Sequence, residues 1–258
     1  MLNALVRAVS PALARCQLTY VSRTPIDLAR AKAQHRAYVQ ALERAGVRVE
    51  VLATQPDLPD AVFVEDLAVI LDAVAVISRP GTETRRLEVA SIAVALAPRR
   101  RVEYIREPGT LEGGDVLRIG SRIFVGSSLR TNEDGARQFS AIATGLGYEV
   151  TTVPVRGCLH LKTAVTHVER NALLLNDAWV DRSAFGDFDQ IDVPPDEPFA
   201  ANCLDLPDRV LVSSRWPKTR RLLESRGFRT ESVDIGEFEK AEGGLTCLSL
   251  LFDAKITA

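Results

Sequence analysis

The sequence predicts an α/β fold built from five repeated β-rich modules. Short apolar runs alternate with helical segments along the whole chain, and no Pro/Ser/Gly-rich linker divides it, so we expect a single domain over residues 1–258. Five segments share one form, in which small or polar residues and a chemically active residue precede an apolar strand. Their markers lie 49, 45, 43 and 44 residues apart: Asp66, Asp115, His160, Cys203 and Cys247. Strand–turn–strand units can give such spacings in any α/β protein, so the period alone leaves a fold without repeats open.

Four segments carry helix signals. Pro25 and Gly46 bracket an amphipathic run, because proline suits the first turn of a helix and glycine its C-terminal cap. Asn132 is a favourable N-cap, and Pro98 and Gly227 each stop a helical pattern. The expected helices span residues 26–45, 84–97, 132–145 and 218–226.

The expected strands are short runs rich in Val, Ile and Leu. They span residues 47–52, 67–71, 74–77, 116–119, 123–125, 150–155, 172–175, 210–212 and 248–252. The stretch 181–198 is rich in Asp and Pro, and we expect it to form a surface loop.

Charge and hydropathy exclude several classes of function. The chain has 32 Lys and Arg against 34 Asp and Glu, a net charge of −2, which argues against bulk affinity for nucleic acid or for anionic membranes. The longest apolar stretch, residues 61–77, contains Glu65, Asp66 and Asp72, so it cannot cross a membrane. Residues 1–15 are basic, but Pro11 interrupts them and serine is sparse. We therefore expect no targeting peptide, and we expect a cytoplasmic location.

Cysteine spacing and glycine motifs argue against metal and nucleotide cofactors. Cys16, Cys158, Cys203 and Cys247 are far apart and form no C-x-x-C pair, which disfavours a disulfide scaffold and the common zinc knuckles. No P-loop or G-x-G-x-x-G motif is present, and an isolated Gly-Gly pair such as residues 113–114 is usually a turn. No cofactor is expected.

The three histidines predict different environments. His35 falls mid-helix among polar residues, where we expect a solvated side chain. His160 and His167 are seven residues apart, so on one continuous strand they would face opposite sides and could not share a metal. His160 begins an apolar strand. It fits a core histidine, a proton-transfer group, or a metal ligand together with Cys158, and these alternatives stay open.

Cys247 and two pairs of carboxylates are the other candidates for chemistry. Cys247 follows Gly-Gly-Leu-Thr, which permits a tight turn and an exposed nucleophile, although a buried cysteine on the last strand fits equally. Residues 65–66 and 112–115 place carboxylates in apolar surroundings, where each must leave the core or find a cationic partner. A thiol, an imidazole and several carboxylates around one centre favour a planar cationic substrate such as a guanidinium.

These segments together resemble the dimethylargininase family of the guanidino-group-modifying superfamily. The resemblance runs from about residue 16 to residue 252. It is carried by residues 16–19, 25–28, 34–35, 58–66, 79–81, 85–86, 111–117, 130–132, 159–162, 200–203 and 245–247. It implies a five-bladed α/β propeller of pseudo-symmetric modules around a central active site, which agrees with the period above. It also implies a small-molecule substrate and no metal, and it allows a homodimer.

The family resemblance assigns the catalytic roles. It makes Cys247 the nucleophile that attacks the guanidinium carbon and His160 the acid and base, so that methylated arginines yield citrulline and dimethylamine or methylamine. Glu112 and Asp66 match the carboxylates that orient the guanidinium, and Glu65 belongs to the same matched segment. A free thiol has a pKa near ~8.5, so we hypothesise that the bound guanidinium itself favours the Cys247 thiolate.

The resemblance also assigns the residues that hold the amino-acid end of the substrate. Arg85 and Arg130 match the pair that binds the α-carboxylate, and Asp60 matches the group that receives the α-amine. Leu18 and Ala241 match further contacts.

The choice of guanidine within the superfamily depends on residue 162. Arginine deiminases carry an Asp two residues after the active His, where this chain has Lys162. The missing carboxylate leaves one guanidinium edge free for methyl groups, which predicts that methylated arginines react better than arginine. Three alternatives stay open: another guanidine as substrate, a non-catalytic guanidine-binding protein, and a zinc protein that uses His160 with Cys158 or Cys247.

Overall fold

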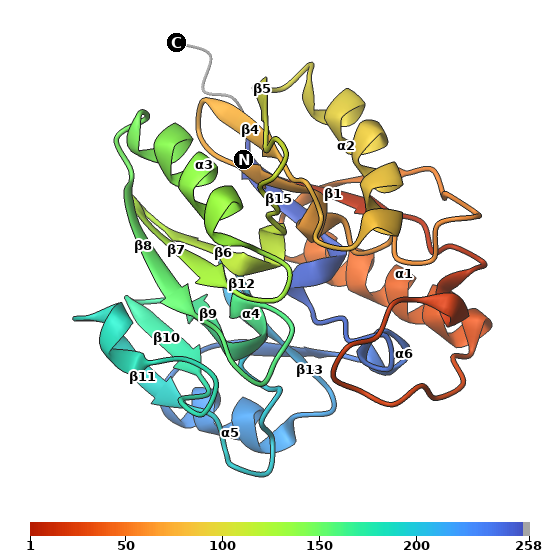
Figure 1. Ribbon diagram of the computed structural model, residues 1–258. Helices are drawn as coiled ribbons and strands as arrows, with labels where there is room; N and C mark the ends of the chain where they lie inside the picture. The colour runs from red at the N-terminus through yellow and green to blue at the C-terminus, as the bar shows by residue number, and fades with distance from the viewer. Residues whose placement is uncertain (255–258) are drawn as a thin grey trace.

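Five three-stranded sheets surround a common centre (Figure 1). The protein is described by a computed structural model, which covers residues 1–254. The sheets are β15-β1-β2 (Leu250–Asp253, Leu2–Arg7, Arg48–Leu52), β3-β4-β5 (Ala68–Ile70, Val74–Ile77, Arg101–Tyr104), β6-β7-β8 (Val116–Ile119, Arg122–Ser127, Glu149–Pro154), β9-β10-β11 (Val165–Val168, Ala172–Leu175, Asp189–Asp192) and β12-β13-β14 (Leu204–Leu206, Arg209–Ser213, Thr230–Val233). The predicted fold of five α/β modules is confirmed.

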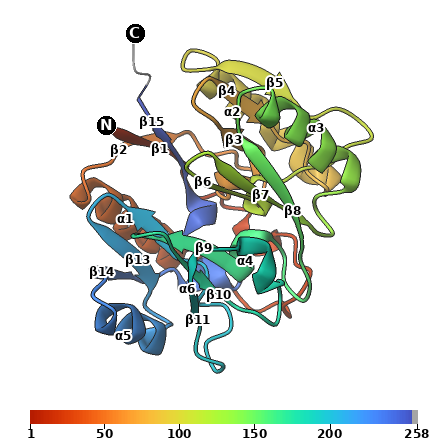
Figure 2. The same ribbon diagram turned by 90° about the vertical axis from the view of Figure 1, so that its left-hand side faces the viewer.

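Each module repeats one connection. Its inner strand pairs antiparallel with the middle strand, and the outer strand pairs parallel with the middle one, as for β3, β4 and β5. A parallel pair needs a crossover, which here is a helix on the rim of the molecule (Figure 2). The crossover helices are α1 (Leu28–Arg44), α2 (Val89–Leu96), α3 (Glu133–Thr144) and α5 (Pro217–Ser225), and a 3₁₀ turn, Arg182–Phe185, serves the fourth sheet. That turn and β11 lie within the stretch 181–198, so its assignment as a plain loop was wrong.

The two ends of the chain build the first module together. β15 pairs antiparallel with β1, with Leu2 opposite Asp253 and Leu5 opposite Leu250. Figure 2 shows these segments, at opposite ends of the colour scale, side by side. The strand β1 was not predicted, although it supplies the buried residues Ala4, Leu5 and Val6. The ring of modules is therefore closed by contacts between residues about 250 positions apart.

The predicted helices form, with ends that follow their caps. The Asp27 side chain accepts hydrogen bonds from Ala29 N and Arg30 N, so α1 begins at Leu28, two residues later than expected. Asn132 caps α3 as predicted by accepting a hydrogen bond from Gly135 N. The expected helix 84–97 divides into a 3₁₀ segment, Glu83–Glu88, and α2.

A short turn precedes the inner strand in four of the five modules. The turns are the 3₁₀ segments Val64–Leu67, Gly113–Asp115 and Thr246–Leu248 and the short helix α4 (Leu161–Ala164). His160 is the N-cap of α4, and β9 begins only at Val165, so the expectation that His160 starts a strand was wrong. These turns bring the repeat markers to one end of the inner strands.

His35 is buried, which contradicts its expected place on a solvated face. Helix α1 buries Ala31, His35, Tyr38 and Leu42, which recur at helical spacing. The His35 ring lies 6.4 Å from that of Phe238, and burial lowers its pKa to about 4. His35 is thus a neutral core residue.

No helix in residues 1–254 combines the length and the apolar character that crossing a membrane requires.

Candidate active site

The turns before the inner strands converge on one cavity. Most of the predicted site residues line it: Asp60, Asp66, Arg85, Glu112, Arg130, His160, Ala241 and Cys247. Leu18 and Glu65 are the two exceptions. Gln17 lines the cavity beside Leu18, and Glu65 lies on the opposite side of its turn from Asp66. Of the five repeat markers, Asp66, His160 and Cys247 line this cavity, whereas Asp115 and Cys203 do not.

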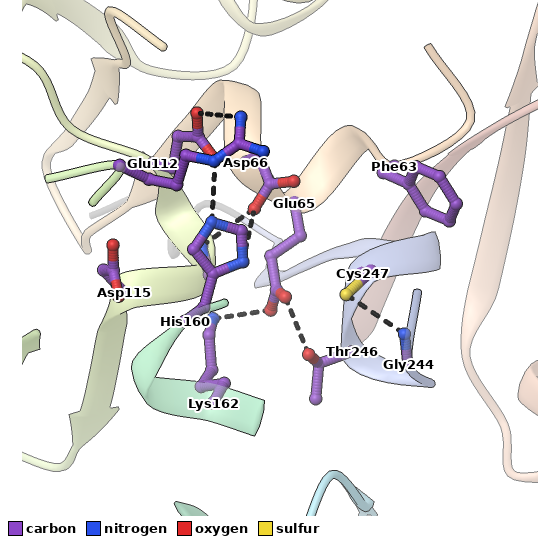
Figure 3. A network of polar contacts seen from close by, with 12 residues as sticks. Phe63, Glu65, Asp66, Glu112, Asp115, His160, Lys162, Gly244, Thr246 and Cys247 are labelled. Carbon is purple, nitrogen blue, oxygen red and sulfur yellow. Dashed lines mark hydrogen bonds and ion pairs between the residues drawn. The ribbon is translucent and has the colours of Figure 1, made fainter. Parts of the chain in front are cut away.

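His160 lies between two carboxylates (Figure 3). Its Nε2 is 2.7 Å from Glu112 Oε2, and its Nδ1 is 3.8 Å from Asp66 Oδ1. Burial alone would lower the pKa of His160, but the charge on Asp66, the hydrogen bond with Glu112 and the charge on Asp115 raise it to about 9. The imidazole is therefore protonated at neutral pH.

Two backbone features fix the position of the imidazole. A Cβ atom at Gly114 would come within 2.6 Å of His160 Nδ1 and within 2.8 Å of an Asp66 oxygen, so only glycine fits there. Asp115 Oδ1 accepts a hydrogen bond of 2.9 Å from Leu161 N, which anchors the turn that follows His160. The pair 113–114 thus packs against the histidine as well as forming a turn.

Asp66 forms a buried ion pair with Arg85. Arg85 Nη1 lies 2.6 Å from Asp66 Oδ2, and Nη2 lies 2.9 Å from Glu88 Oε2. Burial alone would raise the pKa of Asp66, but the charges on His160 and Arg85 hold it below its usual range. Arg85 also donates to the Phe63 carbonyl at 3.0 Å. Its guanidinium is thus already satisfied by protein groups.

Arg130 and Asp60 both line the cavity and are both buried. Arg130 donates a hydrogen bond of 2.9 Å to the Thr19 hydroxyl, and its Nη1 is 3.8 Å from Glu112 Oε1. Asp60 accepts a hydrogen bond of 3.1 Å from Gln17 N. A cation and an anion in the cavity match the two charged groups of an α-amino acid.

Cys247 lies on the 3₁₀ turn Thr246–Leu248 as a partly buried, unpaired thiol. Its Sγ accepts a hydrogen bond of 3.3 Å from Gly244 N. Burial, followed by the charges of Glu65 and Asp66, raises the pKa of the thiol well above its usual range. A nearby cation is therefore needed to favour the thiolate.

Glu65 and Asp66 lie on a 3₁₀ turn with their side chains on opposite sides of it, and both are buried. Each has its own cation: Asp66 pairs with Arg85, and Glu65 Oε1 lies 2.5 Å from Lys162 Nζ. Both buried carboxylates therefore have the cationic partner that their burial requires. Lys162 is thus an internal counter-ion.

Asn202 and Thr246 connect the turns of Lys162 and Cys247. The Thr246 hydroxyl donates to Glu65 Oε2 at 2.7 Å, and Asn202 Nδ2 donates to that hydroxyl at 3.0 Å. Asn202 also donates to the Lys162 carbonyl at 2.8 Å and accepts from Thr246 N at 3.1 Å. The fifth module, β12-β13-β14, therefore supplies an amide, which sequence reasoning missed although it precedes the marker Cys203.

Cys203 and Cys158 do not line the active-site cavity. Cys203 is buried and borders a separate cavity of about 350 Å³ at the far ends of the inner strands. Within residues 1–254, one group of three side chains lies close enough together to hold a metal ion, namely Asp66, Glu112 and His160. This group contains none of Cys158, Cys203 and Cys247. The zinc alternative with Cys158 or Cys247 therefore has no third protein ligand.

Glu242 holds the loop at the mouth of the cavity and was not predicted. Its carboxylate accepts hydrogen bonds from the backbone N–H groups of Thr19, Tyr20 and Val21, at 2.9 Å for Thr19 and 2.7 Å for Val21. Glu242 has a φ of 60°, a conformation that non-glycine residues rarely adopt. No local sequence signal indicates this contact, because the partners are more than 220 residues apart.

Comparisons with known proteins agree on one family. Residues 19–249 match the family model described as N,N dimethylarginine dimethylhydrolase, eukaryotic. The N(G),N(G)-dimethylarginine dimethylaminohydrolase of Pseudomonas aeruginosa is 39% identical over 228 residues, which cover 88% of this chain and 90% of that protein. The protein of the same name from Streptomyces coelicolor is 42% identical, with 96% of each chain covered.

Solved structures give the same result. A cysteine-to-serine variant of the Pseudomonas aeruginosa enzyme, complexed with citrulline, is 35% identical, with a TM-score of 0.92 and coverage of 97% of this chain and 98% of that one. A dimethylarginine dimethylaminohydrolase adduct with S-methyl-L-thiocitrulline is 36% identical, with a TM-score of 0.92 and coverage of 97% and 99%. The N-terminal domain of ArgZ, a cyanobacterial arginine dihydrolase, shares the fold at 20% identity and a TM-score of 0.84, with coverage of 97% and 98%.

Proposed function

Since this chain belongs to the dimethylarginine dimethylaminohydrolase family, we propose that it hydrolyses asymmetric dimethylarginine and monomethylarginine to citrulline and dimethylamine or methylamine. The observation that carries the proposal is the meeting of Cys247, His160, Glu112 and Asp66 in one cavity. A thiol, a protonated imidazole and two carboxylates are the groups that covalent hydrolysis of a guanidinium needs.

The substrate is held at both ends. Glu112 and Asp66 accept hydrogen bonds from the guanidinium nitrogens, for which their charge and geometry are suited. Arg130 receives the α-carboxylate and Asp60 the α-amine, and the backbones of Leu18 and Ala241 complete the contacts. The family resemblance makes Arg85 the second ligand of the α-carboxylate, but its guanidinium already binds Asp66 and Glu88, so we assign it the role of holding Asp66 in place.

The bound guanidinium activates the nucleophile. Burial and the neighbouring carboxylates raise the pKa of Cys247, so these protein groups favour the protonated thiol. A guanidinium beside Sγ supplies the missing positive charge and favours the thiolate, at about 1.4 kcal/mol for each unit of pKa. The thiol therefore ionises when the substrate is present.

The reaction proceeds in two displacement steps. The Cys247 thiolate attacks the guanidinium carbon, the C–S bond forms, and the bond to the methylated nitrogen breaks as His160 gives that nitrogen a proton. His160 then takes a proton from water, whose oxygen attacks the same carbon. The C–S bond breaks, which releases citrulline and regenerates the thiolate. Because Nε2 of His160 is held by Glu112, Nδ1 is the atom that transfers these protons.

Residue 162 supports a preference for methylated substrates. Lys162 is bound to Glu65, so this position offers no carboxylate to the far edge of the guanidinium. An edge without an acceptor has room for methyl groups and offers no hydrogen bond to the N–H groups of arginine. One methyl contact is worth roughly 1–3 kcal/mol, so the preference is graded.

The test is citrulline release from asymmetric dimethylarginine and from arginine under matched conditions, with Cys247→Ser as control. Faster release from the methylated substrate, absent in Cys247→Ser, is the expected result. A preference for arginine would indicate that the substrate is an unmethylated guanidine. No release from either would reject the proposed activity.

The proposal includes a single catalytic domain over residues 1–258 without a cofactor, in the cytoplasm. The four unpaired cysteines of the described chain support a reducing compartment. The family resemblance allows a homodimer, which light scattering on the purified protein tests.

A further inference from the structure

A second cavity of about 130 Å³ adjoins the candidate active site. The two cavities share three lining residues, Leu159, Glu242 and Gly243, so they lie on either side of a thin wall. The wall continues into Gly244, whose N–H group donates to Cys247 Sγ (Figure 3). The second cavity is therefore next to the segment that carries the nucleophile.

The second cavity combines aromatic walls with acidic groups. Tyr20, Phe199 and Trp216 contribute ring surface, and Ile235 adds an apolar side chain. Glu239 also lines it. Aromatic faces together with a carboxylate are the surroundings that bind organic cations.

One buried carboxylate oxygen of Glu239 accepts no hydrogen bond and has only a long ion pair with Arg215. Its side chain is 10% exposed, and Oε1 accepts a hydrogen bond of 2.6 Å from the Ser213 hydroxyl. Oε2 is buried and has no hydrogen-bond partner. The neighbouring cation is Arg215, whose Nη1 lies 3.6 Å away, and its side chain is 62% exposed and stacks over Trp216. A buried charged oxygen without a donor is costly, so this oxygen favours a ligand that brings an N–H group.

We propose that this cavity binds a small alkylammonium ion and that its occupant is the methylated amine released at Cys247. The methyl groups would contact the rings of Phe199 and Trp216, and the N–H groups would donate to Glu239 Oε2. The inference rests on the proposed function for the identity of the occupant. The cation site itself stands on Glu239 and the aromatic walls.

The chemistry of the leaving group fits this site. When the C–N bond breaks, the nitrogen takes the bonding electron pair and one proton from His160, and departs as a neutral amine. Alkylamines are stronger bases than imidazole, so the amine then takes a second proton from water and becomes a cation. A cavity beside Cys247 that favours this cation would draw the amine away from the adduct and oppose its return.

The experiment is a titration of the Cys247→Ser protein with dimethylammonium chloride at constant ionic strength, followed by ligand-observed NMR with sodium chloride as reference. A ligand with so few non-hydrogen atoms is limited to a roughly millimolar Kd. We expect saturable binding in that range. Adding Glu239→Gln should weaken it about tenfold, since a hydrogen bond to a charged group is lost.

Two further variants separate the site from general surface charge. Adding Arg215→Ala should tighten binding, because it removes the cation that competes for Glu239 Oε2. Asp187→Asn removes one negative charge from an exposed residue that does not line the cavity, and it should leave the Kd unchanged. Opposite shifts in the first two variants would not arise from simple unfolding.

Three outcomes would overturn the inference. Binding that does not saturate would show that the cavity is not a specific binding site for the ion. An unchanged Kd in Glu239→Gln would show that the ion binds elsewhere. If Glu239→Gln weakened the binding of guanidinium chloride more than that of dimethylammonium, the occupant would be a guanidine and not the amine. Each result can be obtained without turnover, so failure of the hydrolase assignment in the citrulline assay remains distinguishable from failure of the cation site.

Discussion

Nε2 of His160 lies 2.7 Å from Glu112 Oε2, and both side chains are buried. Removed from solvent, the two groups stabilise each other's charge far more than a surface pair would. The contact also fixes which ring nitrogen is free to face the substrate. The position and the charge of the proposed acid therefore both depend on one carboxylate.

Glu112→Gln tests this dependence through the pH profile. The pKa of His160 is about 9 with the carboxylate present, and it should fall when the charge is removed. The alkaline limb of kcat/KM should then move to lower pH, and the maximum should fall by roughly 10²–10³-fold as acid catalysis is impaired. Citrulline release measured against pH checks both. If the alkaline limb stayed at the same pH, it would reflect the ionisation of a group other than His160.

The same pair predicts how stability depends on pH. Because the pKa of His160 rises on folding from 6.5 to about 9, its stabilising contribution is complete below pH 6.5 and is lost as the pH rises through about 9. The free energy of unfolding of the wild type, relative to Glu112→Gln, should therefore be greatest below pH 6.5 and decline toward pH 9. Urea titrations across this range measure the difference. A difference that grows with pH would contradict the assignment.

Ionisation of Cys247 should require the ligand. Without substrate, burial and the carboxylates of Glu65 and Asp66 raise the pKa of the thiol, so little thiolate should form at neutral pH. An unreactive guanidine should lower this pKa, which ultraviolet absorbance of the thiolate reports, with Cys247→Ser as the blank. Equal titration curves with and without the guanidine would refute activation by substrate.

The buried pair of Lys162 and Glu65 should couple strongly in stability. Lys162→Met leaves Glu65 without its cation, and breaking one partner of a buried pair costs about 3–5 kcal/mol. Combining it with Glu65→Gln should recover part of that loss, because no unpaired charge is then left. The free energies of unfolding of the two single variants and the double variant measure the coupling. Additive losses would mean that the pair is not coupled.

Asn202 should act as a positioning residue for Cys247. Asn202→Asp keeps an oxygen for Thr246 N–H but loses the two hydrogen bonds donated by the amide. A small displacement of a reacting group can cost up to about 10²-fold in rate, so kcat should fall by roughly 10–100-fold with KM little changed. Thr246→Ser keeps the hydroxyl and is the matched control. A lower melting temperature with normal kcat would leave Asn202 a purely structural role.

The five-module fold was predictable because the same turn precedes one inner strand after another. Such a repeat puts polar and glycine residues at regular intervals before apolar runs, which a single sequence displays. The outer strands β5 and β14 were missed because their side chains are largely exposed or half-buried and form no apolar run. β1 was missed because its role depends on pairing with β15 at the other end of the chain.

The candidate site residues could be named one by one only through the family resemblance. Local sequence left His160 and Cys247 open between core and catalysis, because burial depends on partners distant in sequence. His35 shows the limit of local reasoning, since its polar sequence neighbours hide the buried stripe of α1 that ends against Phe238. Glu242, the acceptor for the Thr19–Val21 loop, could not be predicted either, because its partners are distant in sequence.

Glu242 should control the loop over the active-site cavity. Its carboxylate accepts N–H groups from Thr19, Tyr20 and Val21, while Thr19 also contacts Arg130, the proposed α-carboxylate ligand. Hydrogen bonds to a charged acceptor are worth about 1.5–3 kcal/mol each, so Glu242→Gln should release the loop in part. Amide hydrogen exchange at residues 19–21 should then accelerate by about tenfold or more, and KM for dimethylarginine should rise.

Glu242→Gly separates the carboxylate from the backbone at this position. Glycine accepts the φ of 60° without strain, so it relieves the backbone while it removes all of the hydrogen bonds. If the carboxylate holds the loop, exchange at residues 19–21 should be faster in Glu242→Gly than in Glu242→Gln, although the backbone of the glycine variant is less strained. If strain at Glu242 controls the loop instead, Glu242→Gln, which keeps that strain, should behave like the wild type and only the glycine variant should differ. The order of the three exchange rates therefore decides whether the loop is held by charge or by backbone conformation.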